Sequence, residues 1–436
     1  MITGSGDYVL GTMNEVWEQA QVEGGIGSMR VVSVAGEVPI QSSSDRPLYI
    51  TDTGNTYAAF GELLTAEFTP QAAWRFDYGV NTRFVNTSGT VNGGAVSGSF
   101  SRAQLFTSTN ASGTGQVETQ KYLRYLPGMG GLFRGTAVFA SGTANSEQVL
   151  GIGDSQDGLA FGYNGTTFGT LLRRNGVDTW TPQASWNGDA LSETLYPQLG
   201  NIYQIRFQWL GYGLLHYYVF DKGVQKYVNV HTVKYPNTSP LTHILNPTIP
   251  ILAYIKNKGN TTNLTMFTPS AVAGLEGRPS NEFTNPLDVF NSFDTSRALS
   301  DQNNNHLLSL LNDLTLNGSR NKVPIQINSI QVSGFGAASV NATVRLYRNP
   351  TTAGARSYTA VDASNSPVSA SITTTTITSA NAERAYALVS NSVGRDISFK
   401  EGELIVSPGE VLGIGIRDAA NGSTTWVVTV NWSELF

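Results

Sequence analysis

The chain has 436 residues, of which 40% are hydrophobic and only 14% are charged, and its formal net charge is −5. The length predicts two or three domains with cores of their own. The absence of cysteine excludes disulfides, thiolate nucleophiles and cysteine-ligated zinc. The absence of a basic run excludes the electrostatic footprint of a nucleic-acid binder.

Because charge is scarce, the surface must be completed by Ser, Thr, Asn, Gln and Gly. Neutral polar groups cost less to desolvate than Lys or Glu, so such a surface favours packing against copies of the same chain. The alternative is a stable secreted β protein of low charge. Of the two interpretations, assembly with copies of the same chain is favoured.

Residues 1–45 read as an N-terminal arm. Apolar residues at helix-like spacing predict a helix over 9–24, ended by Gly24 and Gly25. The arm either docks on a neighbouring subunit or caps the first sheet. The first residues lack a positive segment followed by an apolar one, and no apolar run approaches the roughly 20 residues of a bilayer span. We therefore expect neither a secretory signal nor membrane insertion.

Residues 46–127 form a β-rich N-terminal region. The nearly uncharged tract 86–115 is either a Ser/Thr-decorated sheet or a mobile loop. Val91, Val96, Phe100 and Leu105 recur along it, which favours sheet.

Residues 128–277 are expected to form the central domain. The short apolar runs VFASG, VLGIGD, GLAFGYNG and FGTLL alternate with turn residues, and each suits one strand. Ile205, Phe207 and Trp209 alternate with polar residues, and a second strand follows a turn at 210–213. Seven or more antiparallel strands of this kind predict a β-sandwich of the jelly-roll, lectin-like type.

Residues 278–320 read as a linker with one short helix or strand in the leucine-rich stretch near His306. Residues 321–436 predict a second, C-terminal β-sandwich. Its last strand keeps Trp426, Val428 and Val430 on one face. The predicted fold class is therefore all-β and antiparallel throughout.

The usual catalytic constellations are missing from the sequence. None of His216, His231, His243 and His306 belongs to an H-x-x-x-H or H-x-H pair, and His216 and His231 lie in predicted strands beside aromatic residues, as structural histidines do. There is no G-x-S-x-G elbow and no E-x-D-x-x-E strand of the kind a jelly-roll glycosidase requires. We expect no catalytic residue and no cofactor, so a polysaccharide-degrading enzyme is the least favoured function.

Asp154 and Asp157 flank a turn. Their expected role is to accept hydrogen bonds from backbone amides of that turn. A calcium site is the alternative, because two carboxylates and turn carbonyls suit a hard cation.

Four aromatic residues are candidate glycan contacts: Trp180, Trp186, Tyr212 and Tyr217. Exposed aromatic rings can stack on sugar rings. The alternative for the two tryptophans is that they anchor their loop on the core.

The segment from Leu123 to Gly176 resembles one found in structural proteins of tailed bacteriophages and large DNA viruses. The shared pattern is an R-Y-x-P-G-x-G lead, a G-x-G-D turn and the strand pair FGYNGTxFGxLxR. The matching residues are Arg124, Tyr125, Pro127, Gly128 and Gly130, then Gly151 to Asp154, then Phe161 to Arg173. The likeness is dense to about Ser270 and returns in the terminal VNWSEL. The DGLAF strand is also similar to legume-lectin-like sandwiches, although their metal-binding loop is not evident.

The resemblance implies a virion structural protein, assembled in the host cytoplasm and exposed on a bacteriophage particle. It would be a tail-fibre, baseplate or head-fibre (decoration) subunit. Its partners would be copies of itself, often three in fibres, and other virion proteins. The alternative is a carbohydrate-binding module of the same particle that recognises a glycan on the host surface.

Overall fold

The computed structural model describes residues 8–13, 16–23, 26–27, 68–277, 288–299, 304–335, 342–374, 376–379, 382–388, 394–400, 402–418 and 424–436. The chain divides into two compact units, Met1–Asn55 and Thr56–Phe436. Among the described residues, every regular element is a strand except the short 3-10 turn Gln183–Ser185. The predicted all-β, antiparallel fold class is confirmed. Over those same ranges, no helix has the length and apolar character to cross a membrane.

The first unit contains a β-hairpin instead of the predicted helix. Strands β1 (Tyr8–Met13) and β2 (Val16–Glu23) pair antiparallel, and β3 (Ile26–Gly27) adds to β2. The prediction of a helix over 9–24 is therefore wrong. Gly11 and several β-branched residues lower the helix propensity of this segment and favour extended backbone. The rest of the predicted arm, 1–45, lies outside the described residues.

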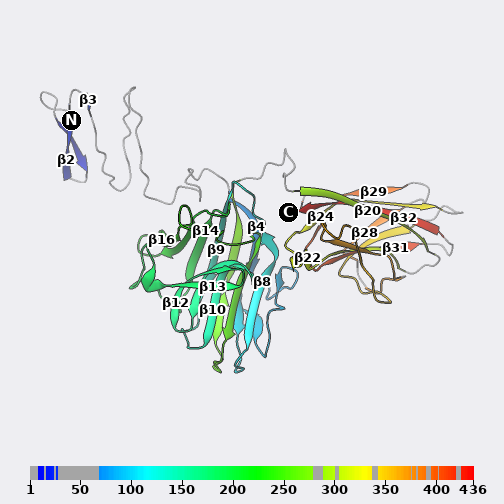
Figure 1. Cartoon of the computed structure of the whole chain (residues 1–436), viewed down its shortest axis with the longest axis horizontal. Coiled ribbons are helices and arrows are strands. Elements are labelled where there is room, and N and C mark those ends of the chain that lie inside the picture. The colour runs from blue at the N-terminus through cyan, green and yellow to red at the C-terminus, as the bar shows by residue number, and fades with distance from the viewer. Residues whose placement is uncertain are drawn as a thin grey trace. The chain divides into compact units, whose positions relative to one another are not determined.

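A seven-stranded sheet forms one layer of the central sandwich (Figure 1). Its strand order is β13-β12-β11-β10-β17-β8-β5. The strands are β5 (Val85–Asn86), β8 (Thr114–Leu123), β10 (Ser146–Gly153), β11 (Gly158–Asn164), β12 (Thr167–Arg174), β13 (Val177–Pro182) and β17 (Ile249–Asn257).

A six-stranded sheet forms the other layer, in the order β16-β15-β14-β9-β19-β4. Its strands are β4 (Phe68–Arg75), β9 (Gly130–Ala137), β14 (Asn201–Phe207), β15 (Leu215–Asp221), β16 (Lys226–Val233) and β19 (Ser270–Glu276). β14 and β15 pair across the predicted turn at 210–213, which is confirmed.

A small sheet of three strands, β18-β7-β6, flanks this sandwich. β6 (Ala95–Ser99) and β7 (Arg102–Phe106) form a hairpin, and β18 (Thr265–Thr268) pairs with β7. The expectation of sheet within 86–115 is confirmed for these strands.

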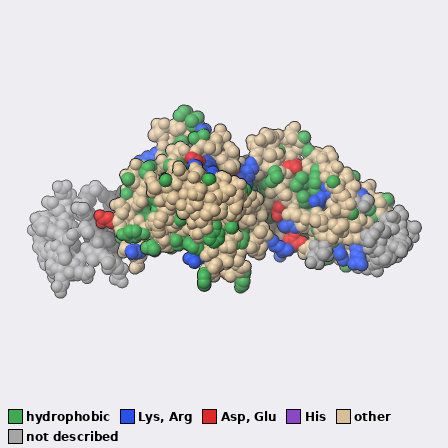
Figure 2. All heavy atoms as spheres, turned by 90° about the horizontal axis from the view of Figure 1, so that it is seen from below, with side chains coloured by type: hydrophobic (Ala, Val, Ile, Leu, Met, Phe, Trp, Pro, Cys, Tyr) green, Lys and Arg blue, Asp and Glu red, His purple; other side chains and the backbone are tan. Residues whose placement is uncertain are grey.

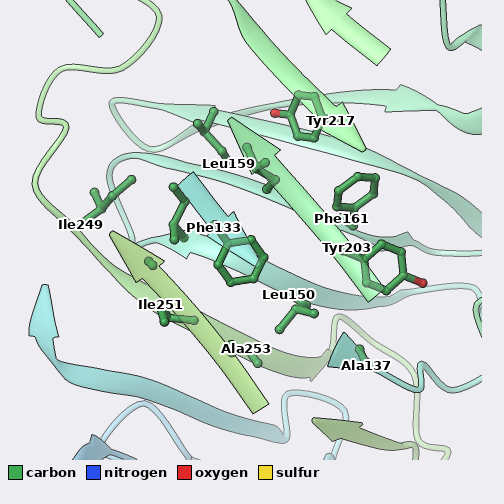
Figure 3. Close-up of a cluster of buried hydrophobic side chains, with 14 of the residues drawn as sticks. Phe133, Ala137, Leu150, Leu159, Phe161, Tyr203, Tyr217, Ile249, Ile251 and Ala253 are labelled. Atoms are coloured by element: carbon green, nitrogen blue, oxygen red, sulfur yellow. The ribbon is translucent and has the colours of Figure 1, made fainter. Parts of the chain in front are cut away.

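The core of the central sandwich follows from the period-two pattern. Side chains alternate between the two faces of a strand, so Ile205 and Phe207 of β14 point inward and are fully buried. They join a continuous apolar cluster to which both large sheets contribute. Figure 3 shows part of it, including Phe133 and Tyr203 of the six-stranded sheet and Leu150, Phe161 and Ile251 of the seven-stranded sheet.

The C-terminal sandwich has its own core and two sheets. One contains β20 (Asp288–Leu299), β24 (Ile325–Phe335), β29 (Arg395–Ser398), β30 (Ile405–Val406) and β32 (Thr424–Leu435). The other contains β21 (Asn305–Asn312), β25 (Ala342–Arg348), β26 (Thr359–Ala360), β27 (Val368–Ser371), β28 (Arg384–Leu388) and β31 (Val411–Asp418). A hairpin of β22 (Thr315–Leu316) and β23 (Ser319–Arg320) completes it. Trp426, Val428 and Val430 face this core, as predicted.

The domains extend beyond their predicted limits. Strands β20 and β21, which lie in the expected linker 278–320, belong to the sheets of the C-terminal sandwich. Strands β4, β5 and β8, which lie in the expected N-terminal region 46–127, belong to the central sandwich. The leucine-rich stretch near His306 is a strand paired on both sides, with β27 and β31.

Candidate functional site

The four candidate glycan contacts do not come together in the structure. Trp186 and Tyr217 lie in the core, where both rings pack edge-on against Phe161. The hydroxyl of Tyr217 donates to the carbonyl of Leu171, 2.9 Å away. Their rings therefore present no face to a ligand, and Trp186 anchors its loop, as the alternative interpretation held.

Tyr212 and Trp180 remain accessible at separate places. Tyr212 is 45% exposed in the turn after β14, and its hydroxyl donates to the carbonyl of Pro240 at 3.2 Å. Trp180 is half-buried on β13, directly opposite Leu171 of β12. Of these two residues, only Trp180 packs on an apolar surface.

That surface is a second apolar cluster, on the face of the seven-stranded sheet that points away from the core. It consists of Val149, Ala160, Leu171, Leu252 and Tyr254, and Trp180 packs against it. We call it the Trp180 face. The ring of Trp180 is thus held in place from below while part of it stays open to solvent.

Charged side chains border the Trp180 face and are bonded to one another. The guanidinium of Arg173 contacts both oxygens of Asp178, at 2.6 and 3.0 Å, and lies 3.7 Å from Glu147. Glu147 also pairs with Lys258 at 2.8 Å and accepts a short hydrogen bond from the hydroxyl of Tyr254. The carboxylates of Glu147 and Asp178 thus share the guanidinium of Arg173.

The pKa values at this rim follow from burial and pairing. Burial alone would lower the pKa of Arg173, but its hydrogen bonds to Asp178 and Tyr254 outweigh burial and raise it. Burial raises the pKa of Tyr254 well above its ordinary value, and the charge of Glu147 adds to this. Arg173 therefore stays charged and Tyr254 neutral. The planar guanidinium of Arg173 and its carboxylate partners lie beside the ring of Trp180, and such a combination of charged groups and an aromatic ring suits hydrogen bonding to a polar ligand.

The side chain of Asp154 accepts hydrogen bonds within its turn, as predicted. Its Oδ1 accepts hydrogen bonds from the amides of Gln156, at 2.7 Å, and Asp157, at 2.9 Å. Burial alone would raise the pKa of Asp154, but the charge of Lys322 and these amides lower it.

The carboxylate of Asp157 accepts hydrogen bonds from amides outside the turn, those of Leu245 at 2.9 Å and Asn246 at 3.2 Å. The predicted role in the turn is therefore confirmed for Asp154 alone.

The residues present do not fit the calcium alternative. The Nζ of Lys322 lies 2.9 Å from Oδ2 of Asp154 and 4.0 Å from Oδ2 of Asp157. An ammonium group therefore already occupies the place where a cation would bind the two carboxylates. Throughout the described ranges, no group of three or more His, Asp or Glu side chains is arranged to hold a metal ion.

The histidines are placed as structural residues. His216 and His231 pack beside Tyr218 and Tyr217. Burial lowers the pKa of His216, His243 and His306 to about 4 in each case. These three imidazoles are therefore neutral near pH 7.

Sequence reasoning missed a groove of about 200 Å³ where β14 begins and β15 ends. We call it the end groove. Its apolar wall is formed by Tyr196, Leu199, Ile202 and Phe220, and Asp221 and Lys222 stand beside it. Asn201 fixes the loop by donating to the carbonyls of Tyr196 and Leu199, at 2.8 and 2.9 Å. The available signal was a pair of apolar residues, Tyr196 and Leu199, inside a Pro/Gly turn sequence.

No protein-family model matches the chain, and no curated protein matches it in sequence. Several solved structures are similar to part of this chain at low identity. A glycosyl hydrolase family protein from Mycobacterium fortuitum is 10% identical, with a TM-score of 0.32, over 47% of this chain and 99% of that one. A Crh5 transglycosylase solved in complex with NAG is 13% identical, with a TM-score of 0.33, over 49% and 89%. A pseudo beta-1,3-glucanase of Mycobacterium tuberculosis is 12% identical, with a TM-score of 0.27, over 41% and 77%.

Proposed function

We propose that this chain is a non-catalytic attachment protein, exposed on a virus particle, whose central sandwich binds carbohydrate at the Trp180 face. The observation that carries the binding part is the half-buried ring of Trp180, supported by an apolar cluster and bordered by Arg173 and Asp178. Apolar support with a few fixed polar groups is the usual composition of a small-ligand site. The placement on a virus particle rests on the resemblance of the segment from Leu123 to Gly176.

The proposal that the chain is non-catalytic is supported by the ion pairing of the two carboxylates beside the Trp180 face. Glycoside hydrolysis requires two carboxyl groups that act from opposite sides of the scissile bond. Glu147 and Asp178 instead share the guanidinium of Arg173. Hydrolysis of a bound glycan by the pure protein, lost in Glu147→Gln, would contradict this part of the proposal.

The binding part is tested on a glycan array and then by calorimetry with the glycan that binds. Trp180→Ala should weaken binding by about thirtyfold, which corresponds to about 2 kcal/mol. Because the change also removes packing on the apolar cluster, Tm should fall while the variant stays folded at the temperature of the assay. Tyr212→Ala, at the other accessible candidate, is the matched control and should bind as wild type does. Equal binding by Trp180→Ala and wild type would refute the site, and an array with no signal would refute carbohydrate recognition.

A second function, assembly with copies of itself and other virion proteins, is favoured by the character of the surface. Figure 2 shows one face on which charged side chains are few and scattered among uncharged ones, with hydrophobic side chains between them. Neutral polar surface can be buried between subunits at little desolvation cost. Electron microscopy and sedimentation of the purified chain should show a defined oligomer. A chain that is monomeric at all concentrations and absent from particles would contradict assembly.

A further inference from the structure

Phe100 occupies a turn position that its side chain disfavours. Ser99 pairs with Arg102, so Phe100 and Ser101 alone connect β6 to β7. Both have positive φ, +51° and +58°, which is the type I′ geometry that Asn-Gly adopts most readily. A bulky residue with positive φ is a genuine outlier. Because Phe100 is 87% exposed, packing within the chain does little to offset this strain, which points to a role in contact with another molecule.

A second exposed aromatic residue lies on the adjacent turn. Tyr78 is 95% exposed and precedes Gly79, whose φ is +81°. A Cβ atom on Gly98 would lie 2.5 Å from the Cα of Gly79, so the backbone of this turn touches the β6–β7 hairpin. We call these two turns with Tyr78 and Phe100 the aromatic tip. Ser, Gly and Asn are frequent among the residues next to Tyr78 and Phe100 in the sequence, a loop composition typical of protein-recognition surfaces.

The strand register places the aromatic tip and the end groove at the same end of the six-stranded sheet. At this end β4 finishes at Arg75, which pairs with Ser270, the first residue of β19. β9 finishes at Ala137, which pairs with Asn201, the first residue of β14. β15 runs antiparallel to β14 and therefore finishes at this end too. Three strand spacings separate β4 from β14, on the order of 15 Å. A two-fold axis between the tip and the groove would therefore place each tip over the groove of the second copy. Such a contact is isologous and closed.

The two surfaces match in size and charge. The groove volume, about 200 Å³, is below the roughly 300–1,000 Å³ of a drug-sized site and suits one aromatic side chain. Exposed Arg75 and Arg83 outnumber Asp77 beside the tip, and Asp221 and Lys222, one charge of each sign, line the groove. Each charge on one surface can therefore meet a charge of opposite sign on the other, which favours one relative orientation of the two copies.

We propose that two copies of this chain pair end to end, each inserting Phe100 of its aromatic tip into the end groove of the other. The pairing rests on the assembly function proposed above and names its partner and its contact surfaces. Tyr78 covers the rim of the groove, and the charged residues around the tip and the groove set the orientation.

The first test replaces the tip in the full-length chain. Phe100→Asn with Ser101→Gly keeps the turn geometry with the residues that adopt it best, so Tm should not fall. In sedimentation experiments the dissociation constant of the pair should rise on the order of thirtyfold. Phe335→Asn removes a 62% exposed aromatic side chain from the C-terminal sandwich and should leave the pairing unchanged.

The second test fills the groove and then mixes the two variants. Gly200 lines the groove, its φ lies outside the positive region, and a Cβ atom there meets no atom within 4 Å. Gly200→Leu should therefore fold normally and lose self-pairing. A mixture of the tip variant and Gly200→Leu should pair more tightly than either alone and less tightly than wild type, because one of the two contacts can form.

The outcomes separate this interface from the assembly function. Wild-type pairing that persists in both variants would overturn the tip–groove contact and leave assembly standing. Failure of the mixture to pair, when both variants are folded, would also overturn it. A wild-type chain that stays monomeric at every concentration would overturn the pairing, and its absence from particles as well would overturn the assembly function.

Discussion

At the scale of single residues, Lys322 controls the stability of the Asp154 turn. Both side chains are buried, and Nζ lies 2.9 Å from Oδ2 of Asp154. Removing one partner of a buried ion pair leaves an uncompensated charge, so Lys322→Met should lower the free energy of unfolding by about 3 kcal/mol. Urea denaturation measures this. The double variant with Asp154→Asn should recover much of the loss, and an unchanged single variant would show that the pair contributes nothing.

The same pair predicts a dependence of stability on pH. Because the pKa of Asp154 is lowered in the folded state, its contribution is complete above the unfolded pKa of about 4 and is lost as the pH falls through the lower, folded value. In Lys322→Met, the lowering of this pKa by the ammonium group is lost and only the lowering by the amides of Gln156 and Asp157 opposes burial. The contribution of Asp154 is therefore smaller in the variant and falls less with acidification. Urea denaturation between pH 6 and pH 3 should show the gap between wild type and variant narrowing. Parallel curves would contradict this account.

Local sequence predicted some of these residue roles and could not predict others. The hydrogen bonds of the Asp154 turn depend on neighbours two and three residues away, which the sequence displays. Lys322 comes from another domain, and no local pattern links it to Asp154. Similarly, the spacing of aromatic residues could not separate Trp186, which is buried, from Trp180, which borders solvent, because burial depends on which strands cover a loop.

At the scale of elements, two glycines give a matched prediction. Gly176, with φ +75°, closes the hairpin between β12 and β13, and Gly176→Ala should cost about 1–2 kcal/mol of unfolding free energy. Gly200 has neither positive φ nor a close neighbour, so Gly200→Ala should stay within about 0.5 kcal/mol of wild type. Thermal and urea denaturation of both variants check this, and equal effects would contradict the conformational argument.

The elements that sequence predicted well are those with strict alternation and clear turns, such as β14, β15 and the last strand, β32. Two other segments lacked that clarity, of which one was predicted wrongly and one was left open between helix and strand. Residues 9–24 place apolar side chains at a spacing that suits a helix, yet the segment forms β1 and β2. β21 carries leucines on both faces and is buried along nearly its whole length, so its apolar residues do not alternate. Such a run cannot be distinguished from a short helix by period alone.

At the scale of the whole molecule, contacts between the central and C-terminal sandwiches predict mutual stabilisation. Lys322 pairs with Asp154, Arg320 lies 3.2 Å from Glu118, and Arg124 pairs with Asp288. A chain that ends at residue 277 would leave Asp154 and Glu118 without these cations. Its central sandwich should therefore unfold at a lower temperature than the same sandwich in the full chain, as calorimetry would measure. Equal Tm values would show that the two sandwiches are energetically independent.

Composition and turn residues were sufficient to predict an all-β chain with two sandwiches, because these features depend on averages over many residues. The positions of the end groove and the Trp180 face depend instead on which strands become neighbours, and that is a property of topology. The site residues were therefore harder to predict than the fold.

The Lys322 ammonium has one more consequence. Many extracellular β-proteins bind a dissolved divalent ion at carboxylate turns, and such proteins weaken when a chelator removes it. Here the neutralising charge is carried on the polypeptide itself and cannot diffuse away. The Asp154 turn should consequently keep its shape in EDTA and in calcium-poor surroundings, so its integrity is independent of the ionic composition of the medium the protein enters.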